Sequence, residues 1–186
     1  MATSLIKGQN IRLAPNATQL SVGLTWNPRA GVGDGFDLDA VCFLLDANEK
    51  ARGDADFIFY HQLESPCGSV KHFGDDLVGV SGERIDVNLA KTPTDVQKIV
   101  FAVAIYEAEK RRQNFGMVRD ASISLVDQRS GAEIARFDLS EDAGVESVLI
   151  FGELYRYQGD WKFRALGESF AGGLEALVRH YGLEIA

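Results

Sequence analysis

The segment 98–108 constrains the fold more than any other part of the chain because it is apolar on both faces. Two interleaved sets of residues alternate along it: Ile99, Phe101, Val103 and Ile105 in one set, Val100, Ala102, Ala104 and Tyr106 in the other. Because successive side chains of a strand point to opposite faces of a sheet, this pattern belongs to a strand that is covered on both sides. The segment therefore predicts the central strand of a sheet with a packed layer on each face.

Several other segments alternate between apolar and polar residues, which is typical of half-buried strands. The apolar positions are Val22, Leu24 and Trp26; Ile85, Val87 and Leu89; and Ile123 and Leu125. We expect further strands at 41–45, 56–60, 133–139, 147–157 and 161–166, with hairpin loops at 128–131 and 157–160. Neighbouring strands then pair antiparallel.

Helix signals are few. A single turn is expected at 92–96, with Pro93 at its first position. The stronger case is the C-terminal segment, where Leu174, Leu177, Val178 and Tyr181 follow helical spacing before a stop at Gly182. The sequence predicts a mainly β fold: one domain over residues 1–186, a two-sheet antiparallel β-sandwich with a C-terminal amphipathic helix and one or two short helical turns.

Composition narrows the classes of function. A net charge of −8 and a pI near 4.9 argue against binding to nucleic acid, which needs a basic surface. The longest apolar run, 99–105, is far shorter than the ~20 residues that span a bilayer, and the N-terminus has no signal-like apolar stretch. We therefore expect a cytoplasmic protein without a transmembrane segment. Its two cysteines are expected to be reduced thiols, Cys42 buried and Cys67 exposed.

Carboxylates gather before the strand that begins near Ala40. In an extended segment Asp37 and Asp39 point to one side, about 7 Å apart, while Leu38 points into the core. Like charges held so close favour a cation between them. Asp34 precedes this pair and is expected to take at most an outer part.

A second acidic, glycine-rich segment, 74–83, precedes the strand with Ile85. It holds Asp75, Asp76 and Glu83. Carboxylate and carbonyl oxygens at flexible turns suit Ca²⁺, which takes ~6–8 oxygen ligands, better than Mg²⁺. If the two strand starts are adjacent, both acidic segments together surround one or two ions; the alternative is that these acids are solvated turn residues. The spacing does not match an EF-hand.

The chain resembles the TerD family of tellurium-resistance and calcium-binding stress proteins along nearly its whole length. The matching stretches include Phe36-Asp-Leu-Asp-Ala40, Gly53-Asp-Ala-Asp-Phe-Ile-Phe-Tyr60, Gly74-Asp-Asp76, Gln113-Asn-Phe-Gly116, Ile150-Phe-Gly-Glu-Leu-Tyr-Arg156 and Trp161-Lys-Phe-Arg-Ala165. The resemblance implies a β-sandwich, a cytoplasmic bacterial protein, a link to tellurite and other stresses, and Ca²⁺ held by the two acidic loops.

The chain departs from the family pattern in the second loop. Asp76 stands where the family usually has Asn, Val78 stands where it has Thr, and the acidic run that follows is shorter. The resemblance therefore implies metal ligation by Asp37, Asp39, Asp75, Asp76 and Glu83, with weaker binding or one ion where relatives hold two.

Two functions follow from these observations. The first is a calcium-binding, non-enzymatic stress-response module, in which Ca²⁺ orders the two acidic loops to form a docking surface for other stress-response or tellurium-resistance proteins, or for a membrane. The alternative is a metal-assisted or thiol-dependent enzyme acting on toxic oxyanions. His61, His72 and His180 lack zinc-site spacing; His61 and His72 are expected at the surface and His180 on the polar face of the C-terminal helix.

Overall fold

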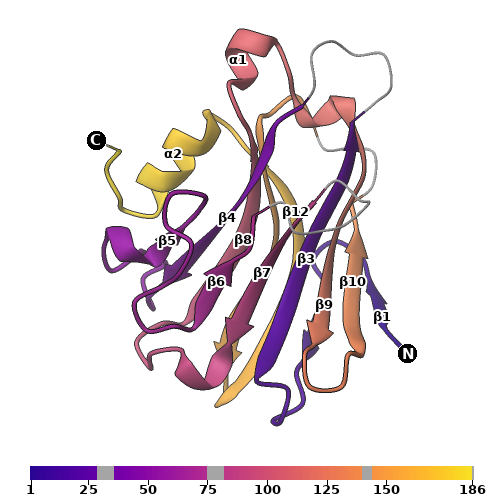
Figure 1. The fold of residues 1–186 in the computed structure, drawn as a ribbon, viewed down its shortest axis with the longest axis vertical. Coiled ribbons are helices and arrows are strands. Elements are labelled where there is room, and N and C mark those ends of the chain that lie inside the picture. The colour runs from indigo at the N-terminus through magenta and orange to yellow at the C-terminus, as the bar shows by residue number, and fades with distance from the viewer. Residues whose placement is uncertain (29–35, 75–81, 140–143, 186) are drawn as a thin grey trace.

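Two six-stranded sheets pack face to face in the computed structural model, which describes residues 1–28, 36–74, 82–139 and 144–185 (Figure 1). The first sheet has the order β1 (Thr3–Leu5), β10 (Glu133–Asp138), β9 (Val118–Asp127), β3 (Gln19–Pro28), β7 (Gly82–Asn88) and β6 (Val70–His72). The second has the order β2 (Asn10–Arg12), β12 (Asp160–Phe170), β11 (Val148–Tyr157), β8 (Lys98–Ile105), β4 (Leu38–Leu45) and β5 (Phe57–Ile58). Apart from the parallel pair β1 and β10, the strand pairs of the described residues are antiparallel. The predicted β-sandwich is confirmed.

β8 is the central strand that the sequence predicts. It lies between β11 and β4, and every residue after Lys98 in it is buried. Ile99 and Phe101 belong to the core between the two sheets, whereas Val100 and Ala102 belong to a second apolar cluster on the outer face of the second sheet. The two apolar faces of this segment therefore serve two separate packing layers.

The outer layer is formed by α2 (Gly173–His180) and the residues that follow it (Figure 1). Leu177, Val178 and Tyr181 pack in the cluster that contains Phe43 of β4, and the Phe43 and Tyr181 ring centroids are 4.8 Å apart. The helix ends where predicted, since Gly182 has a φ of 84° that favours glycine. His180 is exposed on the polar side, as expected.

Turn chemistry explains the tight hairpin between β11 and β12. Its two loop residues, Gln158 and Gly159, have φ of 49° and 83°, as a two-residue turn matched to the strand twist requires. The expected loop at 128–131 lies between β9 and β10, and the turn at 92–96 is closed by a 3.0 Å bond from Val96 N–H to Pro93 O. Both hairpin predictions are confirmed.

The described residues hold more short helical segments than the one or two expected. They are α1 (Ala108–Arg111) and the 3₁₀ turns η1 (Asp54–Asp56), η2 (Leu89–Lys91) and η3 (Phe115–Met117). The short strands β1, β2 and β6 were not predicted, and β5 is shorter than the expected 56–60. Segments of two or three residues carry too few side chains to show a period. Within the described residues, no helix is long and apolar enough to cross a membrane.

Packing of α2 can be tested by truncating Leu177, which is fully buried. We expect Leu177→Ala to lower the free energy of unfolding by about 2–5 kcal/mol, because it leaves a cavity under the helix. Glu175→Ala on the exposed side of the same helix removes only an ion pair with Arg179 and should cost less than about 0.5 kcal/mol. Denaturant unfolding measures both, and equal costs would show that α2 does not depend on this contact.

Candidate functional site

The start of β4 presents its residues as the alternation predicts. Leu38 is 4% exposed and packs between the sheets, whereas Asp37 is exposed and Asp39 partly exposed. The Tyr106 N–H donates to Asp37 O at 2.8 Å, which holds this segment beside the end of β8. The strand start is thus fixed by its backbone and by Leu38, and an acidic pair stands at its edge.

Glu83 of β7 reaches from the first sheet to the backbone of β4 in the second. The Ala40 N–H donates to Glu83 Oε2 at 2.6 Å, and Glu83 is 5% exposed. A carboxylate that accepts a backbone N–H makes a strong, charge-assisted hydrogen bond. This contact confirms that the starts of β4 and β7 are adjacent, which the sequence left as a condition. It also uses one oxygen of a predicted metal ligand for a structural bond.

His72 of β6 completes the contact with Ala40. Its Nε2 lies 2.9 Å from Ala40 O and 3.1 Å from Glu83 Oε2, and its Nδ1 accepts from the Gly74 N–H at 2.9 Å. An accepting Nδ1 assigns the proton to Nε2, which then donates to Ala40 O and Glu83. We call the contacts of Glu83 and His72 with Ala40 the Ala40 bridge.

The expectation that His72 lies at the surface is wrong. It is 2% exposed because it shares the inward face of β6 with Val70, which is fully buried. The alternation of Val70, Lys71 and His72 is the sequence signal that places His72 inward, but a three-residue strand makes that signal weak. His61, in contrast, is exposed as expected.

The Ala40 bridge satisfies backbone groups that no strand reaches. β5 pairs with β4 only at Cys42 and Phe43. Because backbone groups two residues apart point to the same edge of a strand, Ala40 directs its N–H and C=O to the edge that β5 does not cover. Buried backbone groups without partners are costly, and the side chains of Glu83 and His72 take the place of the missing strand.

Electrostatics link Asp39 to the bridge. Burial lowers the pKa of His72, but the hydrogen bond and charge of Glu83 outweigh burial and raise it, with further upward contributions from Ala40 O and the charge of Asp39. Asp39 therefore lies close enough to act on the buried imidazole. The donors available at the strand start, the carboxylates of Asp37 and Asp39, are hard oxygen ligands of the kind that Ca²⁺ takes.

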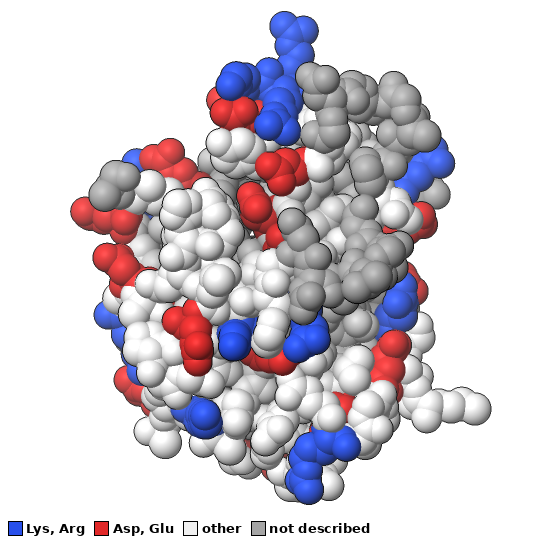
Figure 2. All heavy atoms as spheres, viewed as in Figure 1, with Lys and Arg blue, Asp and Glu red and all other residues white. Residues whose placement is uncertain are grey.

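The predicted partners of this pair, Asp75 and Asp76, lie outside the described residues, as does Asp34. Gly74 and Gly82, which flank 75–81, are described: Gly74 is bonded to His72, and Gly82 precedes Glu83. Among the described residues, no group of three or more His, Cys, Asp or Glu is arranged to hold a metal ion. On the face of the molecule that Figure 2 shows, basic atoms lie at the top and acidic atoms lie just below them.

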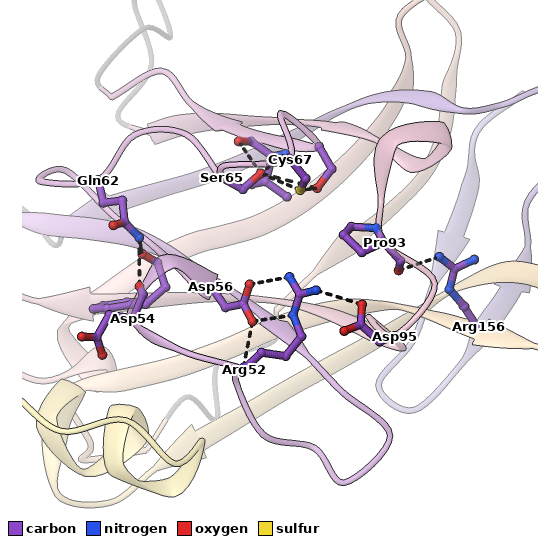
Figure 3. A network of polar contacts seen from close by, with 12 residues as sticks. Arg52, Asp54, Asp56, Gln62, Ser65, Cys67, Pro93, Asp95 and Arg156 are labelled. Carbon is purple, nitrogen blue, oxygen red and sulfur yellow. Dashed lines mark hydrogen bonds and ion pairs between the residues drawn. The ribbon is translucent and has the colours of Figure 1, made fainter.

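A second polar cluster surrounds Arg52 and lies near Cys67 (Figure 3). Arg52 donates to both oxygens of Asp56 at 2.8–2.9 Å and to Asp95 at 2.8 Å, and these carboxylates raise the pKa of the guanidinium. Together with Cys67, these residues line a cavity of about 470 Å³. Two carboxylates balance the charge of Arg52, so the cavity does not favour an anionic substrate.

The two thiols differ in environment. Cys42 is fully buried, and burial raises the pKa of its thiol. Cys67 is partly exposed; burial raises its pKa, but hydrogen bonds with the hydroxyls of Ser65 and Ser69, at 3.4 and 3.1 Å, outweigh burial and lower it. Both cysteines are free, as expected.

Comparisons with known proteins bear on the family and on the fold. The family described as TerD domain matches residues 1–181. The chain is 49% identical to the tellurium resistance protein TerD of Alcaligenes sp over 98% of both chains, and 43% identical to the general stress protein 16U of Bacillus subtilis (strain 168) over the whole of both. A crystal structure of a homologue of telluride resistance protein (TerD) from Streptomyces coelicolor A3(2) superposes with a TM-score of 0.68 at 16% identity, covering 87% of this chain and 95% of that one, and shows the same fold.

The Ala40 bridge predicts unequal effects of two substitutions at Glu83. Glu83→Ala leaves the Ala40 N–H without its acceptor and should lower the free energy of unfolding by about 1–3 kcal/mol. Glu83→Gln keeps an accepting oxygen at the same place and should cost less than half as much. Urea unfolding of the two variants compares them; an equal loss in both would mean that the charge of Glu83, and not its hydrogen bond, stabilises the fold.

Proposed function

The chain belongs to the TerD family, and from that premise we propose that it is a Ca²⁺-binding, non-enzymatic stress-response module. The observation that carries the proposal is the bond from Ala40 N–H to Glu83, because it brings the starts of β4 and β7 together. Each of these strands follows an acidic segment, so one cation would be shared by both. The names of the relatives, tellurium resistance protein and general stress protein, support a role in stress resistance.

In the proposed site, Asp37, Asp39, Asp75 and Asp76 hold the ion. Glu83 stands behind them, and its bond to Ala40 N–H makes it a positioning residue for the start of β4. Asp39 and Glu83 lie on opposite faces of β4, since Asp39 points outward and Glu83 approaches the edge at Ala40 from the first sheet. Calcium would reduce the repulsion among the carboxylates and so order both acidic loops.

Calcium binding predicts a metal-dependent gain in stability. A ligand that binds only the folded state adds ~2.7 kcal/mol at a hundred times its dissociation constant. We expect Ca²⁺ to raise the melting temperature relative to EDTA, and Mg²⁺ to raise it much less, because Ca²⁺ accepts irregular oxygen coordination whereas Mg²⁺ requires a near-octahedral shell. Thermal melts in the three conditions measure this.

The matched variants separate binding from net charge. Asp37→Asn with Asp39→Asn should abolish the Ca²⁺ effect, whereas Glu133→Gln with Glu175→Gln, which removes the same charge from β10 and α2, should leave it intact. A wild type that does not respond to Ca²⁺, or an Asp37 and Asp39 variant that still responds in full, would contradict the proposed site.

The ordered loops form the proposed docking surface, which binds other stress-response or tellurium-resistance proteins in the cytoplasm. A net charge of −8 disfavours nucleic acid, and it disfavours anionic lipid unless a cation lies between the protein and the headgroups. Sedimentation with anionic vesicles, with and without Ca²⁺, distinguishes protein partners from a membrane. Calcium-dependent sedimentation of the chain alone would assign the docking surface to lipid.

The proposed absence of catalysis predicts no turnover of tellurite. The carboxylates that balance Arg52 make the cavity beside Cys67 unfavourable for an oxyanion, although its thiol has a lowered pKa. We expect purified protein with glutathione to reduce tellurite no faster than glutathione alone, and Cys67→Ser to change nothing. Reduction that depends on Cys67 would establish the enzymatic alternative.

A further inference from the structure

A cavity of about 320 Å³ lies between the β5 edge of the second sheet and the segment that follows α2. Its apolar lining comes from both sides: Phe57 and Phe59 from the sheet edge, and Val178, Leu183 and Ile185 from the C-terminal segment. The volume is at the lower end of the range for small-molecule sites, and an apolar lining with a few polar groups is typical of them. This cavity shares no residue with the Ala40 bridge.

One wall of the cavity is a continuous stack of rings that begins in the core. Phe43 stacks on Phe57 at 4.7 Å and Phe57 on Phe59 at 4.4 Å, both with rings within 11° of parallel, and His61 continues the stack from Phe59 at 5.8 Å. Phe43 is fully buried and His61 is exposed, so the stack runs from the interior to the surface. Phe57 and Phe59 are each covered on both faces by neighbouring rings, so they present apolar ring edges to the cavity.

The wall is braced by Gln62. Its Nε2 donates to Asp54 O at 2.9 Å and to Phe57 O at 2.6 Å, which ties η1 to the turn after β5. Figure 3 shows the carboxylate of Asp54 on the side of its backbone away from Gln62. Since the amide nitrogen of Gln62 is used within the wall, the charged groups on the lining decide which ligand the cavity favours.

Those charged groups are both acidic. Asp54 and Glu184 line the cavity from opposite sides, and the described lining contains no Lys or Arg. Two basic side chains of neighbouring segments are engaged in other contacts: Arg179 pairs with Glu175, and Lys50 Nζ donates to His180 O. An apolar cavity bordered by two carboxylates disfavours anions such as fatty acids and favours a cation whose apolar body fills the cavity.

We propose that this cavity binds a small amphipathic cation, a compound with an apolar or aromatic body that carries an ammonium group. The body occupies the space between Phe57, Phe59 and Leu183, and the ammonium group lies between Asp54 and Glu184. The occupant is a free small molecule, and its recognition does not depend on the calcium site.

Three probes of equal shape test the charge preference. They are 3-phenylpropylammonium, 3-phenylpropan-1-ol and 3-phenylpropionate, titrated into the full chain in EDTA and followed by amide chemical shifts. We expect the cation to bind at least about tenfold more tightly than the alcohol, with shifts centred on Phe57, Phe59 and Leu183, and the anion to bind more weakly than both. Equal binding of the three probes, no binding at millimolar concentration, or shifts centred elsewhere would overturn the proposal.

Variants of the exposed acids locate the interaction. Asp54→Asn with Glu184→Gln should bring the affinity for the cation to within about twofold of that for the alcohol, and leave the alcohol unchanged. Phe59→Ala should weaken both probes, because it removes apolar contact area from the cavity wall. Glu109→Gln with Glu133→Gln, which removes the same charge from α1 and β10 and leaves the ion pair of Glu175 with Arg179 intact, is the control and should have no effect. Unchanged selectivity in the Asp54 and Glu184 variant would contradict the assignment, whatever the outcome of the calcium experiments.

Discussion

The hydrogen bond from Ala40 N–H to Glu83, 2.6 Å long, fixes how the two sheets meet at the acidic end of the sandwich. Elsewhere the sheets contact each other mainly through apolar side chains, which tolerate small shifts because the hydrophobic effect has no direction. The Ala40 bridge is directional and uses the backbone, so it sets the position of β4 relative to β7. His72 closes the arrangement by donating to Ala40 O, 2.9 Å from Nε2. Two side chains of the first sheet thus take the place of strand pairing at Ala40, which β5 does not reach.

This constraint gives β4 its several roles. At its start, Leu38 enters the core while Asp37 and Asp39 remain at the surface, so the packing of one residue places two charges. Four residues after Asp39, Phe43 supports α2 through Tyr181 and begins the stack of rings that leads to the acidic cavity. A single strand, held at Ala40, therefore positions both the proposed calcium ligands and the wall of the proposed cation site.

Much of this arrangement is predictable from the sequence because strand periodicity survives in long segments. The doubly apolar pattern of Ile99 to Ile105 predicts β8 at the centre, and the alternation around Leu38 predicts which side chains of the acidic segment enter the core. Short segments hold too few residues to show this periodicity. β6 has three residues, and the prediction that its His72 lies at the surface is wrong, because the side chain points inward. The bond between Glu83 and Ala40 joins residues 43 positions apart, and no local pattern shows that a carboxylate will meet a backbone N–H. Asp75 and Asp76 lie outside the described residues, so their part in the site rests on the sequence.

The most direct test of the central claim is the hydrogen exchange rate of the Ala40 amide, measured by NMR on the wild type in EDTA. An edge amide without a partner exchanges rapidly, whereas one bonded in the core opens only with large-scale unfolding. The Ala40 bridge predicts that this amide exchanges as slowly as the amides of β8, and that Glu83→Ala selectively speeds its exchange. Rapid exchange of Ala40 in the wild type, at the rate of an exposed edge amide, would contradict the account.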